Sequence, residues 1–111
     1  MVARYWSARA RPDTGDRYLR HFTDHVLPSL QQIDGFVSAT VLRRTVGRSI
    51  EIVVTTYWRS LDDIRRFAGD DIEIAVVTDE AASLFVDYDR RVRHYEVVDL
   101  EPRSSRSHEG Q

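Results

Sequence analysis

Apolar and polar residues alternate along four stretches of the chain, residues 2–10, 36–44, 50–58 and 92–98. A period of two places successive side chains on opposite faces of an extended backbone, so each stretch is predicted to form a β-strand. The second and third stretches are separated by five residues with a glycine at their centre. That spacing is typical of a β-hairpin.

Between the first and second strands, apolar residues recur every three or four positions and predict an amphipathic helix. This helix follows the break at Pro12, and either Asp13 or Thr14 is expected to cap it. Pro28 lacks an amide hydrogen, so we expect a kink or a fresh turn there. The predicted apolar face consists of Tyr18, Leu19, Phe22, Val26 and Leu30.

A second helical region is predicted after the third strand. Ser60, with an aspartate three residues on, has the spacing of a capping box and predicts a helix that ends at Gly69. Asp70 and Glu73 repeat this spacing and predict a short helix that reaches about residue 77. Thr78 is expected to cap one or two further turns that end near residue 85.

The predicted order is strand, helix, strand, strand, helical region, strand. This is the split βαβ order of a ferredoxin-like α+β fold with a four-stranded antiparallel sheet. The length of 111 residues is enough for one hydrophobic core. We therefore expect a single domain over residues 1–100, followed by a loose polar tail over residues 101–111.

Both faces of the predicted sheet carry apolar side chains. Ile52 and Val54 share one face of the third strand, whereas Val53 and Tyr57 lie on the other face. Two helical segments can cover only one face of a four-stranded sheet, and an uncovered apolar face usually marks an interface. We therefore predict a homodimer formed through the sheet. The alternative is that the tail or a loop covers this face.

Composition excludes several classes of function. The 16 basic and 18 acidic residues give a net charge of −2, which supplies no electrostatic reason to expect a nucleic acid partner. The chain has no cysteine, which excludes disulfides, thiolate catalysis and the commonest zinc sites.

His21 and His25 lie four residues apart without an evident third ligand, and no metal site is predicted. There is neither a signal-peptide pattern nor an apolar stretch of roughly 20 residues, so we expect a cytoplasmic protein with no membrane partner.

Two of the predicted strands carry the most reactive side chains. His94 can act as a base or proton shuttle near neutral pH, and Glu96 lies on the same strand face. The alternative is a buried histidine bonded to a backbone carbonyl. Arg4 and Trp6 share a face of the first strand and could hold an anionic or aromatic ligand. The alternative for this pair is a surface arginine beside a core tryptophan.

Five short segments occur along the chain in a distinctive order. They are Asp34-Gly35-Phe36, Tyr57-Trp58-Arg59-Ser60, Phe67-Ala68-Gly69-Asp70-Asp71, Ala75-Val76 and His94-Tyr95-Glu96-Val97. In order and spacing they resemble the antibiotic biosynthesis monooxygenase family, whose members are dimeric α+β barrels. The resemblance covers residues 2–98.

The resemblance implies a cofactor-independent monooxygenase that acts on a small aromatic or polyketide-like molecule. In such a reaction the pocket stabilises a substrate carbanion or phenolate that itself reacts with oxygen. His94 is then the candidate proton acceptor, and Arg4 is the candidate for stabilising negative charge. The candidate substrate-binding residues are Trp6, Tyr57, Trp58, Phe67 and Asp71. Core packing is the alternative role for the aromatic residues at positions 58 and 67, and solvated surface is the alternative for the aspartate.

The chain departs from both oxygenase site types of that family. Haem-degrading members carry an iron-ligating histidine where this chain has Val77, which cannot bind iron. Members that oxidise polycyclic phenols carry an asparagine and a tryptophan where this chain has Asp63 and Phe67. Two alternatives therefore stay open. One is a haem-binding or haem-degrading protein in which His94 ligates iron, and the other is a non-enzymatic binding or interaction module.

Overall fold

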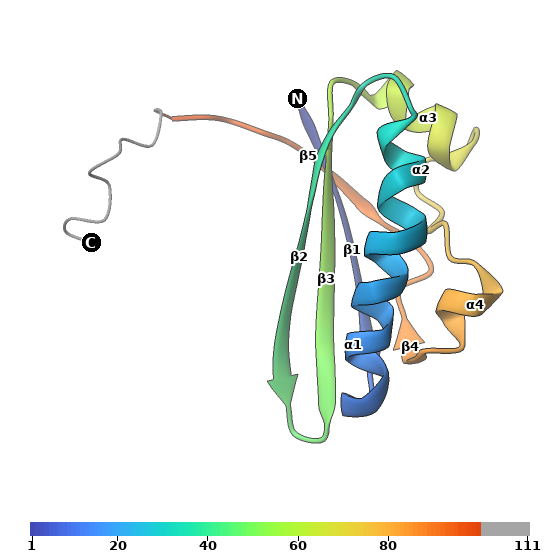
Figure 1. The fold of residues 1–111 in the computed structure, drawn as a ribbon. Coiled ribbons are helices and arrows are strands. Elements are labelled where there is room, and N and C mark those ends of the chain that lie inside the picture. Colours follow the sequence, from blue (N-terminus) through green and yellow to red (C-terminus); the bar gives the residue numbers. More distant parts are fainter. Residues whose placement is uncertain (101–111) are drawn as a thin grey trace.

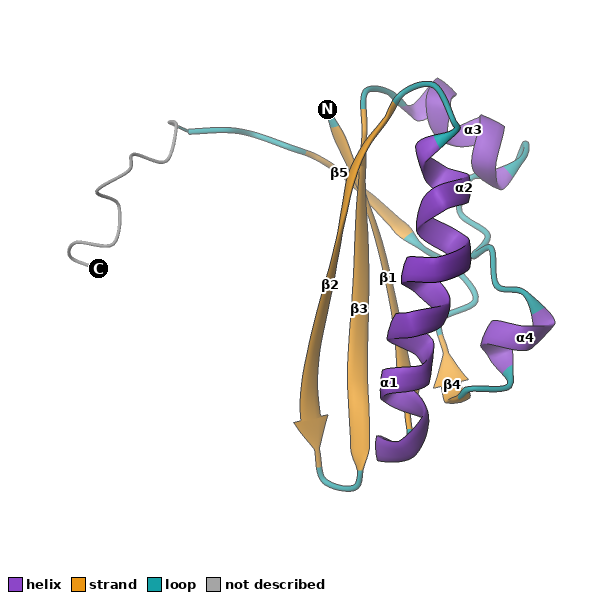
Figure 2. Cartoon of the chain, viewed as in Figure 1, coloured by secondary structure: helices purple, strands orange, loops and turns teal. Residues whose placement is uncertain are grey.

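A five-stranded antiparallel sheet with helices on one side forms the body of the chain (Figure 1, Figure 2). The computed structural model describes residues 1–100. The strands lie in the order β2-β3-β1, with β4 and β5 both beside β1, and this confirms the predicted ferredoxin-like α+β class. The elements are β1 (Val2–Ala10), α1 (Pro12–His21), η1 (Phe22–Val26), α2 (Leu27–Gln31), β2 (Phe36–Val46), β3 (Ser49–Trp58), α3 (Leu61–Ala68), α4 (Asp79–Ala82), β4 (Phe85–Tyr88) and β5 (Arg93–Glu96).

Two short strands in line fill the fourth position of the sheet. β4 pairs with the end of β1, where Phe85 lies opposite Ala10, and β5 pairs with its beginning, where Glu96 lies opposite Val2. The sequence predicted one strand here and a helix continuing to about residue 85. The predicted helix ends at Ala82, close to the expected limit, but strand β4 was not predicted. Its first residue, Phe85, packs its ring 5.5 Å from the Trp6 ring of β1, and its backbone extends this edge.

The predicted first helix contains one unusually wide turn. α1, η1 and α2 follow one another directly, and within η1 the Leu27 amide donates to the carbonyl of Phe22, five residues earlier. Pro28 follows at once. In a regular helix its ring would clash with the carbonyl four residues earlier, and it has no amide hydrogen to donate. The disturbance expected at Pro28 is therefore confirmed, in the form of a π-type turn.

The start of this helix differs from the prediction. Pro12 is its first residue and Arg11 takes the cap position, so neither Asp13 nor Thr14 caps it. Proline is favoured at the first helical position because the amide it lacks has no partner within the helix there. The Thr14 hydroxyl instead accepts a hydrogen bond from the Arg11 amide at 3.2 Å.

The predicted hairpin and the predicted cap of the second helical region are confirmed. β2 and β3 form the predicted hairpin, although Val46 pairs with Ser49 and the turn is shorter than expected. Gly47, the first of the two turn residues, has a φ of +61°, the left-handed region that favours glycine. Ser60 caps α3 as predicted, since its hydroxyl oxygen accepts from the Asp63 amide at 3.2 Å.

The short helix predicted over residues 70–77 does not form. The carbonyls of Ile72 and Ile74 accept hydrogen bonds from the Arg4 side chain, at 2.5 Å and 2.9 Å respectively. Because these carbonyls point toward Arg4 of β1, they do not accept the backbone hydrogen bonds of a local helix. Thr78 then caps α4 as expected, accepting a backbone amide through its hydroxyl oxygen.

The core lies between the helices and one face of the sheet. Its largest fully buried apolar side chains are Trp58, Leu30, Ile52 and Ile64. Burying one such side chain stabilises the fold by about 1.5–3 kcal/mol. The same sheet face also carries two buried polar side chains, Arg4 and Thr56. Polar groups are therefore buried where the sheet meets the helices.

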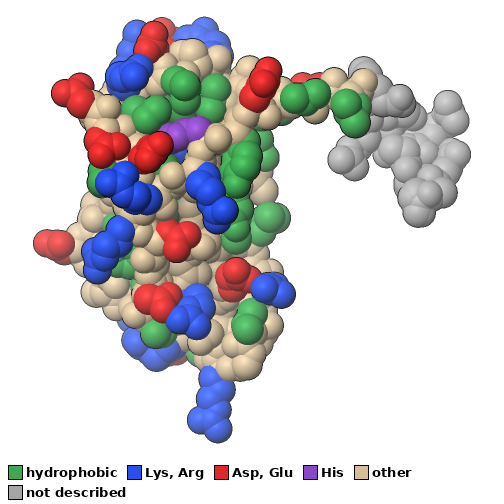
Figure 3. All heavy atoms as spheres, turned by 180° about the vertical axis from the view of Figure 1, so that it is seen from behind, with side chains coloured by type: hydrophobic (Ala, Val, Ile, Leu, Met, Phe, Trp, Pro, Cys, Tyr) green, Lys and Arg blue, Asp and Glu red, His purple; other side chains and the backbone are tan. Residues whose placement is uncertain are grey.

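Within the described part of the chain, no helix covers the other sheet face (Figure 1). Register places Leu42, Val46, Val53, Tyr57 and Tyr95 on that face. Leu42 is 57% exposed, and Tyr95 is exposed as well. From behind, apolar side chains lie between charged ones over the surface (Figure 3).

The predicted tail, residues 101–111, lies outside the described residues, and the domain boundary at residue 100 stays a prediction. None of the helices in residues 1–100 combines the length and the apolar character that crossing a membrane requires.

Candidate functional site

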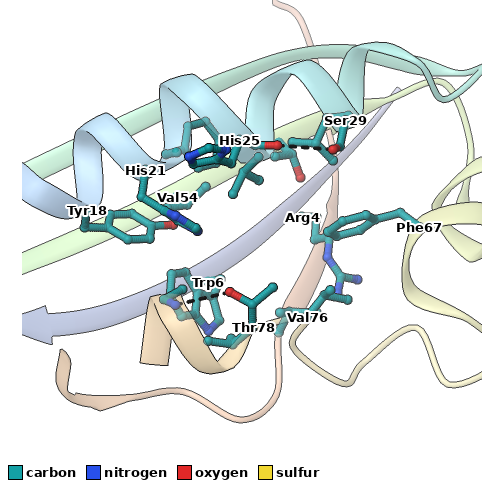
Figure 4. Close-up of a pocket in the computed structure, with 17 residues that line it drawn as sticks. Arg4, Trp6, Tyr18, His21, His25, Ser29, Val54, Phe67, Val76 and Thr78 are labelled. Carbon is teal, nitrogen blue, oxygen red and sulfur yellow. Dashed lines mark hydrogen bonds between the residues drawn. The ribbon is translucent and has the colours of Figure 1, made fainter. Parts of the chain in front are cut away.

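A cavity of about 280 Å³ lies between the long helix and the sheet. β1 and β3 supply its floor, and α1, η1 and α2 supply one wall. α3, α4 and residues 76–78 close the remaining sides (Figure 4). Most of the lining is apolar, so the few polar side chains in it decide what the cavity can bind.

Arg4 is the buried cation of this cavity. Only 4% of the residue is exposed, and its guanidinium donates to the carbonyls of Ile72 and Ile74. The guanidinium carbon also lies 5.6 Å from the centre of the Phe67 ring. Among residues 1–100, no carboxylate pairs with it. Burial lowers the pKa of Arg4 to about 10, so it remains a cation at neutral pH.

His94 lies directly beside Arg4. The two residues are opposite each other across β1 and β5, and Arg4 Nη1 is 3.0 Å from His94 Nε2. A guanidinium only donates, so Nε2 must accept and the ring proton sits on Nδ1. Burial first, and the Arg4 charge second, lower the pKa of His94, while Glu73 opposes the shift. His94 is therefore neutral near pH 7, and its free electron pair is turned to Arg4.

This geometry differs from both interpretations of His94 made from the sequence. The side chain does not line the cavity, and its Nε2 bonds to a guanidinium rather than to a backbone carbonyl. The structure thus brings the two catalytic candidates, His94 and Arg4, together as a pair. Only Arg4 of the two faces the cavity.

Trp6 and Phe67 are the predicted substrate-binding residues that line the cavity. Trp6 is fixed by a hydrogen bond from its indole nitrogen to the carbonyl of Asp89, at 2.7 Å. Its ring lies 6.3 Å from that of Tyr18. Phe67 lies beside the Arg4 side chain at the other end of the cavity (Figure 4). Both ends of the cavity therefore have an aromatic wall.

Three predicted substrate-binding residues lie outside the lining of this cavity. Tyr57 is on the opposite face of the sheet, because neighbouring residues of a strand alternate between faces. Trp58 is fully buried in the core, with its indole nitrogen 2.9 Å from the Thr56 hydroxyl and its ring stacked on Phe67. Asp71 is exposed, and its carboxylate accepts from a local backbone amide.

The helix contributes a row of polar residues that sequence reasoning did not assign to the site. Spacings of three, four and four place these residues on one line along the helix, and this line shares its first residue with the predicted apolar face. They are Tyr18, His21, His25 and Ser29. Figure 4 shows this row above the cavity, with Trp6 and Thr78 opposite. The periodic polar positions were a usable signal, but only the fold shows that the row faces a cavity.

His21 is the buried member of the row. Neither of its ring nitrogens has a hydrogen-bond partner among the described residues. A carboxylate oxygen of Glu80, on α4, lies 3.6 Å from its Nδ1. Beside it, burial raises the pKa of Tyr18, so that hydroxyl keeps its proton and can donate a hydrogen bond. The cavity thus has a cation at one end and a donor with a possible acceptor at the other.

No cluster of three or more histidine, cysteine or acidic residues that could hold a metal ion is found in residues 1–100.

Comparison with known proteins identifies relatives of this chain. A family model, antibiotic biosynthesis monooxygenase, matches residues 1–71. The uncharacterized proteins MT2635 and Rv2558 of Mycobacterium tuberculosis are each 34% identical over 111 residues, which is 99% of this chain and 44% of each relative. The chain therefore spans less than half the length of these relatives.

Several solved structures share the fold. A proposed antibiotic biosynthesis monooxygenase from Bacillus cereus has a TM-score of 0.64 at 17% identity, over 92% of this chain and 97% of that one. The Streptomyces coelicolor monooxygenase from ActVA-Orf6, in complex with nanaomycin D, has a TM-score of 0.58 at 17% identity over 91% of each chain. The haem degrader MhuD of M. tuberculosis, with two haems bound in its active site, has a TM-score of 0.57 at 17% identity, over 91% of this chain and 100% of that one.

At these identities the solved structures establish the fold, and the family model establishes membership. Arg4, Trp6 and His21 lie within the matched residues, whereas Glu80 and His94 lie beyond them. Because the match covers 71 of the 111 residues, the chain belongs to the antibiotic biosynthesis monooxygenase family.

Proposed function

We propose that the protein binds a small aromatic anion in the cavity between the long helix and the sheet. The observation that carries this proposal is Arg4, a buried cation in the wall of a mainly apolar cavity with no carboxylate partner among the described residues. Burying an unpaired charge is costly, and a ligand with an anionic group would offset that cost. Arg4 is thus the proposed anchor for the ligand.

The hydrogen bonds of Arg4 leave room for such a ligand. A guanidinium has five N–H donors. Three are used within residues 1–100, by the carbonyls of Ile72 and Ile74 and by His94. The two that remain can bind a carboxylate or a phenolate oxygen. The contact with His94 then has a positioning role, since it fixes the guanidinium between the two carbonyls and the ligand.

The cavity volume limits the size of this ligand. An apolar cavity of about 150 Å³ is enough to hold benzene, and most ligand pockets span roughly 300–1,000 Å³. The 280 Å³ here therefore suits a molecule of one or two rings. Trp6 and Phe67 would stack against such rings at the two ends.

Family membership supports monooxygenase chemistry on that ligand. A phenol and O₂ contain the same atoms as a quinone and water, so the conversion needs no external reductant. The reactive species would be the electron-rich phenolate or carbanion of the substrate itself. Arg4 would stabilise the negative charge, and the apolar wall would exclude water from it. This is the proposed role of the site in a cofactor-independent reaction.

A haem fits these residues poorly. His94 already accepts a hydrogen bond from Arg4 through Nε2, and the side chain does not line the cavity. A macrocycle of four pyrrole rings also exceeds the one or two rings that 280 Å³ suits. We therefore assign no step to a haem ligated by His94.

We also propose that two copies associate through the open sheet face. Leu42, Val46 and Tyr95 leave apolar surface exposed on this face, which no helix of the described chain covers. Membership of the antibiotic biosynthesis monooxygenase family, whose resemblance implies dimeric α+β barrels, supports this proposal. Face-to-face packing of two sheets would bury these side chains.

A calorimetric titration of the purified protein with 2-naphthoate tests the proposed anion site. We expect binding of 2-naphthoate and about tenfold weaker binding of 2-naphthamide, which has the same rings without the charge. Arg4→Gln should remove this preference, and Arg4→Lys, which keeps the charge, should retain part of it. Equal binding of both ligands by the unchanged protein would contradict an anion site at Arg4.

Oxygen consumption then separates an enzyme from a binding module. With 1,5-dihydroxynaphthalene as the probe, protein-dependent uptake of oxygen that Arg4→Gln reduces would support the monooxygenase. Tight binding of aromatic anions without any oxygen uptake across a panel of phenols would favour the non-enzymatic module.

A further inference from the structure

The end of the cavity away from Arg4 contains a buried histidine without a partner. His21 is 9% exposed and lines the cavity, and both of its ring nitrogens lack hydrogen-bond partners among the described residues. Buried polar groups in proteins are almost always hydrogen-bonded. A polar group of a ligand in the cavity can therefore supply the hydrogen bond that this imidazole lacks within the described residues.

The fold holds His21 in place at this end. It is the last residue of α1, directly before the wide turn η1. Its ring lies between those of Tyr18 and His25, at centroid distances of 6.3 Å and 5.4 Å. Figure 4 shows Tyr18, His21 and Trp6 at one end of the cavity, and Arg4 with Phe67 at the other. A ligand bound at Arg4 would thus extend toward His21.

Glu80 on α4 lies close to His21. Its carboxylate oxygen is 3.6 Å from Nδ1 of His21, slightly beyond hydrogen-bond distance, and its side chain is 73% exposed. A carboxylate at Nδ1 favours a proton on that nitrogen and leaves the electron pair on Nε2. Catalytic hydrogen bonds are often long without substrate and shorten when it binds. The pair therefore resembles a general base with an orienting carboxylate.

We propose that His21 is the proton acceptor of the cavity and acts on the phenolic hydroxyl of a ligand whose anionic group is held by Arg4. In this step the O–H bond of the phenol breaks and an N–H bond forms at Nε2 of His21. The electron pair stays on the oxygen, which becomes a phenolate. Glu80 is a positioning residue, because it touches His21 and not the ligand.

This inference rests on the proposed function and makes its substrate class more specific. The ligand carries a phenolic hydroxyl and a carboxylate at opposite ends of a frame of one or two aromatic rings. Tyr18 lines the same end of the cavity as His21 (Figure 4), and burial raises the pKa of its hydroxyl, so it can donate a hydrogen bond to the phenolate. His94 is not available for this step, because its Nε2 is bonded to Arg4.

The probe 6-hydroxy-2-naphthoate tests the proposal in the full-length protein. It has the required groups at opposite ends, and its phenolate absorbs at longer wavelength than its phenol. At about pH 7 we expect the bound probe to show a larger phenolate fraction than the free probe. His21→Asn should lower the phenolate fraction of the bound probe about tenfold, because one hydrogen bond to a charged group is lost. Asp24→Asn, an exposed change in the adjacent wide turn, should leave it unchanged.

Glu80 provides a second variant that leaves the core intact. Glu80→Gln should lower the phenolate fraction several-fold without changing the affinity for 2-naphthoate, which has no hydroxyl. Glu80→Asp should restore part of the signal, and Asp79→Asn serves as the matched control on α4. A purely structural role of Glu80 would not change the ionisation of a bound probe.

The outcomes separate this inference from the proposed function. If 2-naphthoate binds in an Arg4-dependent way but His21→Asn and Glu80→Gln leave the phenolate fraction unchanged, only the role of His21 is overturned. If neither naphthoate binds the unchanged protein, the anion site and the proton acceptor are both overturned. If His21→Asn fails to fold, the Glu80→Gln result decides.

Discussion

The turn before β2 requires glycine at position 35 for two separate reasons. Gly35 has a φ of +97°, which side-chain-bearing residues rarely adopt. A Cβ atom added there would lie 2.2 Å from Cγ and 2.4 Å from Cβ of Asp63. Asp63 belongs to the first turn of α3, and its Cβ is fixed by the helix backbone, so a side-chain rotation alone cannot relieve the contact. Gly35→Ala should therefore displace the turn or α3.

The two causes give an expected loss of stability. A non-glycine residue in the left-handed region costs about 1–2 kcal/mol, and overpacking costs a further 1–3 kcal/mol. The sum is about 2–5 kcal/mol of unfolding free energy. For a domain of roughly 100 residues, each kcal/mol lowers Tm by about 4–8 °C. Gly35→Ala should thus lower Tm by roughly 8–40 °C.

Gly47 provides the matched control for thermal and urea unfolding. It has a φ of +61°, but a Cβ atom added there meets nothing within 4 Å. Gly47→Ala should therefore show only the backbone cost of about 1–2 kcal/mol. If the two variants unfold at the same temperature, the close approach of Gly35 to Asp63 contributes nothing to the loss of unfolding free energy. Because α3 also carries Phe67 of the cavity wall, 2-naphthoate affinity should fall in Gly35→Ala and not in Gly47→Ala.

Three further changes test the capping, the titration and the assembly. Ser60→Ala should lower stability by about 0.5–2 kcal/mol in urea unfolding, because the Asp63 amide loses its cap; a change within error would show that the cap is dispensable. In the folded protein, burial and then the Arg4 charge lower the pKa of His94 below the ordinary 6.5. As the pH falls, His94 therefore binds a proton in the unfolded chain before it does so in the folded protein. Stability should therefore decrease from about pH 6.5 downward through the lowered pKa, and His94→Gln should flatten this dependence in Tm measurements; parallel curves would contradict the assigned titration. Sedimentation at micromolar concentration should give twice the chain mass, and Leu42→Asp should shift it to the single-chain mass; a monomer before the change would refute the sheet-face dimer.

The sequence by itself was sufficient wherever the controlling interactions are local. Strand β1 has the predicted limits, since alternation of apolar and polar residues expresses the strand period directly. The cap at Ser60, the end of α3 before Gly69 and the disturbance at Pro28 each follow from groups within about five residues. The predicted family is confirmed by the family model over residues 1–71.

The tertiary structure decided whatever depends on contacts between distant residues. The segment after α3 is not helical because its carbonyls bond to Arg4, which lies 68 and 70 residues away in sequence from Ile72 and Ile74. The same long-range packing places Phe67 in the cavity wall and buries Trp58 in the core, although the two rings stack on each other. It also turns His94 toward Arg4 and places His21 beside Glu80, 59 residues further along the chain. Residue type and spacing identify groups capable of chemistry, but only the packing of α1 and α4 against the sheet determines which of them share a cavity.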